Sequence, residues 1–523
     1  MKPSTNPTVP DTALPAPARA AMGQSHFHES ARAQVAGAAH YIDDLPEVKG
    51  TLYAAPILST VAHGTLNGVD ASAALALPGV RGVVLAADVP GDKILAAFGH
   101  DEPVFAVESV QFVGQVIGLV VADSVMQARR AVRAVKLDIT PLPAVLTVQD
   151  ALQAQSYVLP PVFVRRGDAA TGLAQSAHRM QGAFEVGGQE HFYLEGQIAY
   201  ALPLEQKQWW IYSSTQHPGE VQHWVAHALG IDNHAVKVEC RRLGGGFGGK
   251  ETQAGHLAVW AAVAANKLGR PVKLRLDRDE DFMVTGKRHP FAYEYDVGFD
   301  DTGRITGLKL QMAANCGFSA DLSGPVADRA VFHADNAYYL SDVEIASYRC
   351  KTNTQSHTAF RGFGGPQGVI VIEAILGDIA RTLGRDALAV RLANLYGKDA
   401  SAGRNITHYQ MTVEDNILHA LLPQLEQSSR YRQRQADIAA WNAQSPVLKR
   451  GMAITPVKFG ISFTATLFNQ AGALVHVYTD GSVQVNHGGT EMGQGLHTKV
   501  AQIVADELGI PFARVLCTAS DTS

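Results

Sequence analysis

Apolar and polar residues follow two different periods along this chain, and the change of period marks its predicted elements. Residues 236–243, VKVECRRL, alternate apolar and polar positions, which is typical of a half-buried strand. Residues 252–269, TQAGHLAVWAAVAANKLG, carry apolar residues at helical spacing and end in glycine. The pattern therefore predicts a strand, a glycine-rich loop and a helix in succession.

The same periodicities divide the chain into regions. Residues 30–148 combine strands such as GTLYAAPIL and RGVVLAADV with the amphipathic helix ADSVMQARRAVRAV, and they predict a compact α/β unit. Residues 160–398 join further strands by long helices after Gly249 and Pro366. From residue 412 a polar helical segment leads to the predicted strands GMAITPVKF, ALVHVYTDG and SVQVNHGGT. We therefore predict a multidomain chain of α/β and α+β class.

The two ends of the chain differ from its middle. Residues 1–29 are rich in Pro, Ala, Thr and Ser and have few large aliphatic side chains, so they predict a disordered, mobile arm. Residues 412–523 hold too few predicted elements for a whole domain, because the last segment, IPFARVLCTASDTS, stops after one strand and a polar turn. We therefore expect that this sequence is truncated at its C-terminus.

Composition narrows the possible function classes. The 523 residues carry a net charge of −5 with scattered basic residues, so they indicate neither nucleic-acid binding nor an anionic membrane. No run approaches the ~20 apolar residues of a membrane span, and no secretory core is present, which predicts a cytoplasmic protein. The cysteines are too far apart for a zinc site, an iron–sulfur cluster or a disulfide framework, and we expect free buried thiols at Cys240, Cys316, Cys350 and Cys517.

The glycine-rich loop GGGFGGKE, residues 244–251, allows three interpretations. It nearly spells the P-loop motif, but Glu251 stands where a Ser or Thr should bind magnesium. It also contains G-x-G-x-x-G, the dinucleotide fingerprint, although the acidic residue Asp277 follows later than expected. The third interpretation is a turn without a ligand.

Two further glycine-rich loops repeat this arrangement. TAFRGFGGPQG, residues 358–368, and GGTEMGQG, residues 488–495, each precede an apolar helical segment. Glycine leaves backbone N–H groups unshielded, and helix N-termini attract anions. The three junctions together predict a large anionic cofactor held mainly by main-chain amides.

Two polar residues outside these loops are candidate site residues. Gln216 could donate an amide hydrogen bond, or it could be a solvated residue at a strand end. Arg329 lies in an apolar stretch of sequence and could bind a ligand. The alternative is a purely structural role, in a surface ion pair with Asp328 or Asp335.

Aromatic and histidine residues leave similar alternatives. Phe363 and Phe463 could contact a ligand, although phenylalanine is more often a core residue. His223 and His227 have H-x-x-x-H spacing, but tryptophan replaces the glutamate of the zincin motif. This pair therefore predicts a helix surface rather than a metal site.

The motifs in combination resemble one family. GGGFGGKE, DRAVFHADN, TAFRGFGGPQG and GGTEMGQGLHTK occur in this order, together with EHFYLEGQ from Glu190 and STQHP from Ser214. From about Ala36 to its last residue, the chain resembles the molybdenum-binding large subunits of the bacterial xanthine dehydrogenases, in the molybdenum hydroxylase (xanthine oxidase) family. The resemblance implies an α/β hammerhead domain, a first molybdenum-cofactor-binding domain and the start of a second one, over residues 30–148, 160–398 and 412–523.

The resemblance also implies how a cofactor would be held. In this family the dithiolene of a molybdopterin binds the molybdenum, so protein side chains need not be metal ligands. Gln216, Arg361 and the backbone at Phe247 would lie near the molybdenum without ligating it. The remaining cofactor contacts implied by the resemblance are Gly246, Gly248, Gly493 and Gln494.

The implied reaction is hydroxylation of hypoxanthine and xanthine, to xanthine and urate, with oxygen from water. By the resemblance, Phe363 and Phe463 would hold the planar purine between them, and Thr464 would hydrogen-bond it. Glu251 and Arg329 would bind opposite edges, Glu251 sharing a proton with a ring nitrogen and Arg329 stabilising negative charge on a purine oxygen.

Three alternatives remain open. Aldehyde oxidases generally have uncharged residues at the positions of Glu251 and Arg329, so the two charges favour purines over an aldehyde oxidase type of activity. The family's catalytic base, a glutamate in a glycine-rich motif near the C-terminus, is absent from this chain, which leaves a non-catalytic cofactor-binding fragment as the second alternative. A nucleotide-binding protein is the third.

The resemblance further implies a partner. In bacterial members a small subunit carries the 2Fe–2S clusters and FAD and passes electrons to NAD. We therefore expect a cytoplasmic heterotetramer of two large and two small subunits that acts in purine catabolism.

Overall fold

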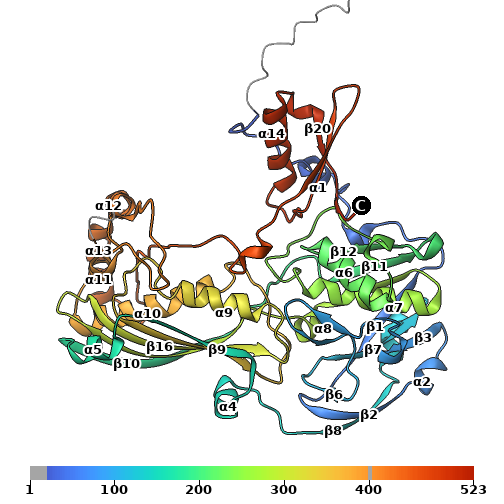
Figure 1. The fold of residues 1–523 in the computed structure, drawn as a ribbon, viewed down its shortest axis with the longest axis horizontal. Coiled ribbons are helices and arrows are strands. Elements are labelled where there is room, and N and C mark those ends of the chain that lie inside the picture. The colour runs from blue at the N-terminus through green and yellow to red at the C-terminus, as the bar shows by residue number, and fades with distance from the viewer. Residues whose placement is uncertain (1–20, 399–402) are drawn as a thin grey trace, which may run out of the picture.

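The computed structural model describes residues 21–398 and 403–523. Figure 1 shows that the described chain separates into a lobe of blue and green elements, a lobe around a long yellow and green sheet, and a red lobe near the C-terminus. The predicted mixture of α/β and α+β elements in several domains is confirmed.

The first lobe is built on a mixed sheet that joins distant parts of the sequence. Its strand β1 pairs in parallel with β14, with Leu52 opposite Val272, so the region predicted as a separate α/β unit shares this sheet with the next region. The strand order is β21 (Ser520–Asp521), β13 (Val236–Cys240), β12 (Trp209–Ser213), β11 (Ile198–Pro203), β14 (Val272–Arg275), β1 (Leu52–Leu58), β7 (Val116–Ala122) and β3 (Val80–Leu85).

Helix α7 (Gln253–Leu268) packs against this sheet and against α6 (Pro218–Leu229). Every residue from Gln253 to Ala265 is buried, because the helix is apolar on nearly all sides. The helix ends at Gly269, which adopts the left-handed conformation expected of a C-terminal glycine. The strand, loop and helix predicted over residues 236–269 are therefore confirmed.

Smaller elements complete the first lobe. The hairpin β4 (Ile94–Ala96) and β5 (His100–Pro103) places Glu102 against His256 of α7, with 2.9 Å between the carboxylate and the ring Nε2. The other elements are α2 (Ser72–Leu75), α3 (Val125–Val132), α8 (Arg278–Val284), β2 (Gly64–Asp70), β6 (Ser109–Val110) and β8 (Lys136–Pro141).

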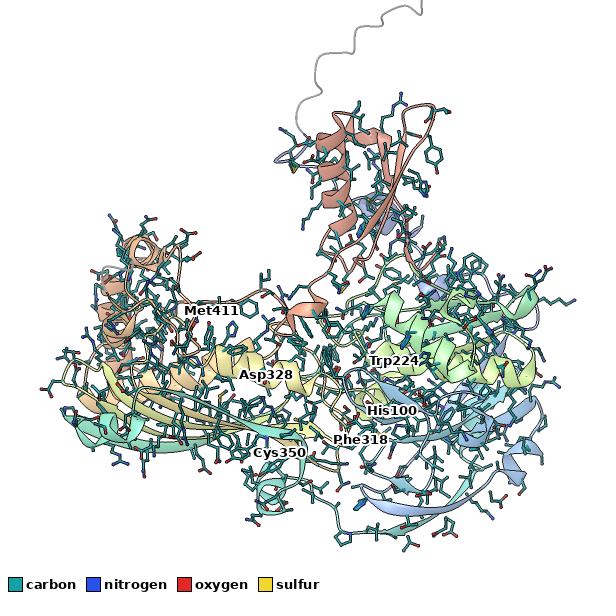
Figure 2. All side chains as sticks on the ribbon, viewed as in Figure 1. His100, Trp224, Phe318, Asp328, Cys350 and Met411 are labelled. Carbon is teal, nitrogen blue, oxygen red and sulfur yellow. The ribbon has the colours of Figure 1, made fainter. Side chains whose placement is uncertain are left out.

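The second lobe is built on a separate sheet with helices α9 and α10 in its core. Asp328 of α9, labelled in Figure 2, forms an ion pair with Arg349 of β17 and fastens the helix to the sheet. The strand order is β10 (His178–Val186), β15 (Phe291–Phe299), β16 (Ile305–Gly317), β17 (Val343–Lys351) and β9 (Tyr157–Arg166). The helices are α4 (Val148–Gln153), α5 (Ala169–Ala174), α9 (Ser323–Phe332), α10 (Gly365–Leu383), α11 (Ala387–Asn394), α12 (Leu418–Ser428) and α13 (Tyr431–Gln444).

The red lobe in Figure 1 contains helix α14 (Leu496–Leu508) and a sheet with the order β18 (Ala473–Val477), β19 (Val483–His487) and β20 (Val515–Cys517). The predicted strand GMAITPVKF is wrong, because residues 451–459 form no regular element. Side chains, rather than a neighbouring strand, accept hydrogen bonds from the backbone of this segment. The N–H of Lys458 donates to Asn336, and the N–H of Gly460 donates to His333.

Part of the predicted N-terminal arm is ordered. Residues 1–20 of that prediction lie outside the described residues, whereas the segment from residue 21 contacts α14. The N–H groups of Met22 and Glu29 donate to Asp506 and Thr498 at 3.0 and 2.9 Å, and helix α1 (Ala31–Val35) follows. The arm prediction is therefore wrong for residues 21–29.

Two predictions from composition can be compared with the structure. All four cysteines of the chain are buried and free of disulfide bonds, as expected. Among the described residues, no helix combines the length and apolar character needed to cross a lipid bilayer.

Candidate active site

The first glycine-rich loop turns sharply between β13 and α7. Gly245, Phe247 and Gly248 have φ values of +98°, +56° and +97°, in the left-handed region that glycine adopts most readily. A Cβ atom on Gly248 would lie 2.8 Å from the carbonyl oxygen of Ala359, which is too close. The loop therefore needs glycine there to pack against the second glycine-rich loop.

Gln216 holds the first loop in this shape. Its side-chain oxygen accepts hydrogen bonds from the backbone N–H groups of Gly248 at 2.9 Å and Lys250 at 3.3 Å. The backbone N–H of Gln216 donates to the carbonyl oxygen of Lys250 at 2.8 Å. Because the side-chain oxygen is engaged, the amide NH₂ is the group that Gln216 can offer to a ligand as a donor.

The second loop lies directly against the first. The N–H of Arg361 donates to the carbonyl oxygen of Phe247 at 2.9 Å. The buried ring of His191 donates from Nε2 to the carbonyl oxygen of Ala359 at 2.7 Å. Gly364, with φ of +93°, then leads into α10. These contacts fix residues 359–364 beside Phe247.

The third loop is organised by Glu491, which the sequence did not single out. Its buried carboxylate accepts hydrogen bonds from the N–H groups of Gly493, Gly495 and His497, at 2.8 to 3.2 Å. Burial opposes ionisation, but these donors outweigh it and lower the pKa of Glu491. The backbone oxygen of Glu491 accepts from the N–H of Leu243, which joins the third loop to the first.

The three loops enclose two adjoining cavities. The first has a volume of about 530 Å³ and is lined by Gln216, Gly246, Phe247, Gly248, Glu251, Ala359, Phe360, Arg361, Gly362, Phe363, Met492, Gly493 and Gln494. The second has a volume of about 450 Å³ and is lined by Ala97, Phe98, Gln216, His217, Glu220, Glu251, Thr252, Leu322, Phe463, Phe468, Gly489, Thr490, Met492, Gln494 and Leu496. Gln216 and Glu251 line both cavities and so lie where the two meet.

Glu251 has an unusual electrostatic environment. Burial and the nearby carboxyl of Asp321 raise the pKa of Glu251 to about 7, and His217 opposes them. A carboxyl with this pKa is partly protonated near neutral pH. It can therefore either donate or accept a hydrogen bond at the junction of the cavities.

Arg329 lines neither cavity. It is 3% exposed, and its guanidinium donates to the carbonyl oxygens of Gly460 and Ser462 and lies 5.6 Å from the ring centre of Phe363. Burial lowers the pKa of Arg329. Among the described residues it forms no ion pair with a carboxylate.

The two aspartates considered as partners of Arg329 are engaged elsewhere. Asp328 pairs with Arg349, and Asp335 lies 2.7 Å from the ammonium group of Lys458. The structural alternative predicted for Arg329, a surface ion pair with either aspartate, is therefore wrong. A buried cation without a carboxylate partner is costly, so Arg329 has the character of a group that meets an anionic or polar ligand.

The two predicted aromatic residues lie next to each other. The ring centres of Phe363 and Phe463 are 5.2 Å apart, with an angle of 48° between the planes. Each lines one of the two cavities. Thr464, next in the chain, lies 3.4 Å from the carbonyl oxygen of Pro325. The structure therefore places this aromatic pair beside Arg329 and close to the cavities.

Two of the alternative interpretations of the first loop do not fit its geometry. The ammonium group of Lys250 is fully buried, 3.0 Å from the carboxylate of Glu195, so it is not available to a phosphate as in a P-loop. Asp277 caps α8 through the N–H of Glu280 and pairs with Arg129, so it is not a free ribose ligand. A nucleotide site is therefore disfavoured.

The side chains that could ligate a metal lie outside the first cavity. His223 and His227 are exposed on α6 with ring centres 3.9 Å apart, as predicted for a helix surface. Within the described residues, the group of His, Cys, Asp or Glu side chains placed to hold a metal is His487, His497 and Cys517, and none of these lines the first cavity. The backbone-rich first cavity therefore fits a cofactor that brings its own metal ligands.

Family models match most of the chain. The model described as "Aldehyde oxidase and xanthine dehydrogenase, a/b hammerhead domain" matches residues 36–143. Two models described as "Molybdopterin cofactor-binding domain" match residues 154–395 and 424–523. All three glycine-rich loops fall within the two molybdopterin matches.

Known proteins resemble the chain over nearly its whole length. Xanthine dehydrogenase/oxidase of Gallus gallus is 44% identical over 96% of this chain, and that of Mus musculus is 42% identical over the same share. The chain spans 37% of the length of each relative. The solved structure of quinoline 2-oxidoreductase from Pseudomonas putida 86 is 25% identical, with a TM-score of 0.82, over 96% of this chain and 67% of that one.

Proposed function

Because the chain belongs to the xanthine dehydrogenase and aldehyde oxidase family of molybdopterin-binding proteins, we propose that it forms the molybdenum-binding part of a purine hydroxylase. The proposed reaction converts hypoxanthine to xanthine and xanthine to urate with oxygen from water. The names of the relatives, which are 41 to 44% identical, support this assignment.

The observation that carries the proposal is the position of Glu251. Its carboxyl lies where the glycine-lined cavity meets the cavity lined by Phe98, Phe463 and Phe468. The first cavity offers backbone and amide donors, so it suits a cofactor. The second cavity offers aromatic surface, so it suits a planar substrate. A titratable carboxyl between them suits a substrate with polar ring atoms.

The molybdenum cofactor would supply the redox chemistry of the hydroxylation. In our proposal the amide NH₂ of Gln216 would donate to it, and Arg361 would lie beside it. The backbone at Gly246, Phe247 and Gly248, which lines the same cavity, would also hold it. On the opposite side Gly493 and the loop that bears Gln494 would hold the pterin. The side chain of Gln494 braces this loop, because its oxygen accepts from the N–H of Met492 at 2.6 Å.

The substrate residues would act on the two edges of the purine. Phe363 and Phe463 would open from their present tilted contact to hold the ring plane, with Thr464 as a hydrogen-bond partner. Glu251 would share its proton with a ring nitrogen. Arg329, already against Phe363, would turn toward a purine oxygen and stabilise the negative charge that develops there.

We also propose where the electrons go. Oxidation of the substrate delivers two electrons that must leave the site, and a partner subunit with 2Fe–2S clusters and FAD would pass them to NAD. The assembly would be a cytoplasmic heterotetramer of two such chains and two partner subunits, acting in purine catabolism. Copurification of a flavin-containing polypeptide with the full-length protein would support this part of the proposal.

The proposed function can be tested with the full-length protein purified together with its partner. Xanthine, hypoxanthine and an aromatic aldehyde are compared as substrates, with oxygen-labelled water as the solvent. We expect label in urate and a much higher kcat/KM for the purines. Faster turnover of the aldehyde would indicate the aldehyde oxidase type of activity, and cofactor content without any turnover would indicate a cofactor-binding role.

A further inference from the structure

Residues 21–30 form a strap between the red lobe and the first lobe. At its start, the side-chain NH₂ of Gln502 in α14 donates to the carbonyl oxygen of Ala21 at 2.8 Å. At its end, Glu29 forms an ion pair with Arg241, just after β13, at 2.8 Å. Figure 1 shows helix α1, which follows the strap, beside the red lobe. The strap therefore crosses from α14 to the first lobe.

His28 in the strap contacts the carboxylate that organises the third glycine-rich loop. Its ring Nε2 lies 3.2 Å from Oε1 of Glu491, which is buried. The other ring nitrogen, Nδ1, accepts the backbone N–H of Ser30 at 3.2 Å. Because Nδ1 is an acceptor, the proton of the neutral ring lies on Nε2, and His28 donates it to Glu491.

The ring of His28 also lies against the backbone of the third loop. A Cβ atom on Gly495 would lie 3.5 Å from Cδ2 of His28, so the ring lies directly over this glycine. Gly495 has φ of +73°, and its N–H donates to the carboxylate of Glu491 at 3.0 Å. His28 therefore contacts both the carboxylate and one of the glycines that the carboxylate holds.

His28 and Glu491 act on the third loop from outside the cavities. Met492, Gly493 and Gln494 line the first cavity, whereas His28 and Glu491 line neither cavity. The carboxylate of Glu491 accepts the N–H of Gly493 at 2.8 Å, so a shift of this carboxylate would move a residue of the cavity wall. The strap is thus linked to the cavity through one side chain and the loop backbone.

We propose that His28 is a positioning residue whose bond to Glu491 keeps the third loop in the shape that receives the pterin. Hydrogen bonds to charged groups are among the stronger ones, and their loss is costly where the charged group is buried. Without His28 the carboxylate keeps its backbone donors, so we expect the chain to fold but the loop to open more often. The inference rests on the proposed function for the identity of the ligand, whereas the contact itself does not depend on it.

Two substitutions of His28 separate its hydrogen bond from its packing. His28→Phe keeps a ring over Gly495 but cannot donate to Glu491. His28→Gln has no ring, but its side-chain NH₂ can donate where Nε2 does. His26→Phe is the matched control, because His26 lies in the same strap and its ring packs against Phe512, which follows α14, with 4.1 Å between ring centres.

The first measurement is hydrogen–deuterium exchange of the full-length protein, purified with its partner from cells that make no molybdopterin. Peptides that cover residues 488–497 report on the third loop without protection by a ligand. We expect these peptides to exchange about tenfold faster in His28→Phe than in the wild type. His28→Gln and His26→Phe should exchange at nearly the wild-type rate, and the urea midpoint should change little in all three variants.

The second measurement follows the pterin. The same proteins are purified from cells that make the cofactor and are dialysed, and the pterin that remains is oxidised and measured by its fluorescence. We expect His28→Phe to lose pterin several-fold faster than the wild type, because a loop that opens more often releases its ligand more often. His28→Gln should restore most of the retention.

Three results would overturn the inference. They are unchanged loop exchange in His28→Phe, an equal increase in His26→Phe, and equal pterin loss in His28→Phe and the wild type. An increase in His28→Gln as large as that in His28→Phe would likewise show that the bond to Glu491 is not responsible. If loop exchange changes as expected but the wild type holds no molybdopterin, the role of His28 in the loop stands and the proposed cofactor is wrong.

Discussion

The side-chain oxygen of Gln216 accepts a hydrogen bond from the backbone N–H of Gly248 at 2.9 Å, and this contact sets the shape of the first glycine-rich loop. Gln216 follows β12 and Gly248 follows β13, so the segments after two neighbouring strands shape one cavity wall. The same glutamine presents its amide donors to that cavity. Loop shape and the proposed cofactor contact would therefore both depend on this one side chain.

Gln216→Leu should reduce cofactor occupancy more than stability. The change removes an acceptor for two backbone N–H groups, at a cost of about 1 to 3 kcal/mol, and it removes the donor that faces the cavity. Molybdenum content per chain and the unfolding temperature are measured together. Gln222→Leu is the control, because Gln222 bonds carbonyl oxygens at Asn233 and Val236 away from the cavity. Equal molybdenum loss in both variants would argue against a cofactor role for Gln216.

Glu251→Ala should lower purine turnover far more than aldehyde turnover. Loss of a hydrogen-bonding group that acts in the transition state costs on the order of 100-fold in rate, and an aldehyde offers no ring nitrogen to this carboxyl. The ratio of kcat/KM for xanthine to that for an aldehyde is the measurement. Glu344→Ala, which removes an exposed ion pair with Arg165 outside both cavities, is the control and should leave the ratio nearly unchanged. Equal losses for both substrates would count against the role of Glu251.

Arg329→Met should abolish most purine turnover but cost little stability. The carbonyl oxygens that Arg329 bonds belong to the exposed residues Gly460 and Ser462, which can bond water instead. Arg391→Met is the contrast, because it removes the cation that lies 2.7 Å from the carboxylate of Glu373 and leaves this mostly buried charge with the neutral donors Asn336 and Tyr338. We expect a loss of about 3 to 5 kcal/mol there, measured by urea unfolding. A comparable loss in Arg329→Met would assign Arg329 a structural role.

Acid should destabilise the protein in part through His191. Burial lowers the pKa of His191 to about 4, below its value of about 6.5 in the unfolded chain. The folded state therefore binds fewer protons, so this contribution is fully present above about pH 6.5 and is lost as the pH falls toward 4. Between about pH 6.5 and 5 the loss is about 2 kcal/mol.

His191→Gln should reduce this acid sensitivity, because glutamine does not titrate and can still donate to Ala359. Urea unfolding at several pH values measures the difference in slope. Part of the pH dependence of the unfolding free energy should remain, because other histidines are also buried. One is His357, whose pKa is lowered by burial to about 3. His217→Gln is the control, since His217 is exposed and its pKa is raised by Glu220. An unchanged slope in His191→Gln would show that this ring does not titrate as described.

The sequence predicted the glycine-rich loops well because glycine acts locally. The backbone at Gly245 and Gly248 needs positive φ whatever the distant chain does, and helix α7 follows from its own apolar pattern. The predicted cofactor residues also line one cavity, because all three loops meet there and each leads into a helix. Local patterns therefore predicted the loops, whereas the family resemblance named the individual cofactor residues, which remain a prediction.

Contacts between distant residues were not predictable in the same way. Glu102, His256 and Asp321 come from a hairpin, a helix and a loop, and no spacing in the sequence relates them. The engagement of Asp328 by Arg349 depends on how α9 packs on β17. The predicted strand at residues 451–459 failed because side chains such as Asn336, rather than a neighbouring strand, satisfy its backbone.

The most direct test of the account is to locate the metal. Crystals of the full-length, cofactor-loaded protein would be measured at the molybdenum absorption edge, and an anomalous difference map calculated. We predict one strong peak per chain in the cavity lined by Gln216, Phe247 and Arg361. A peak elsewhere, for example at His487, His497 and Cys517, would contradict the assignment of this cavity to the molybdenum cofactor.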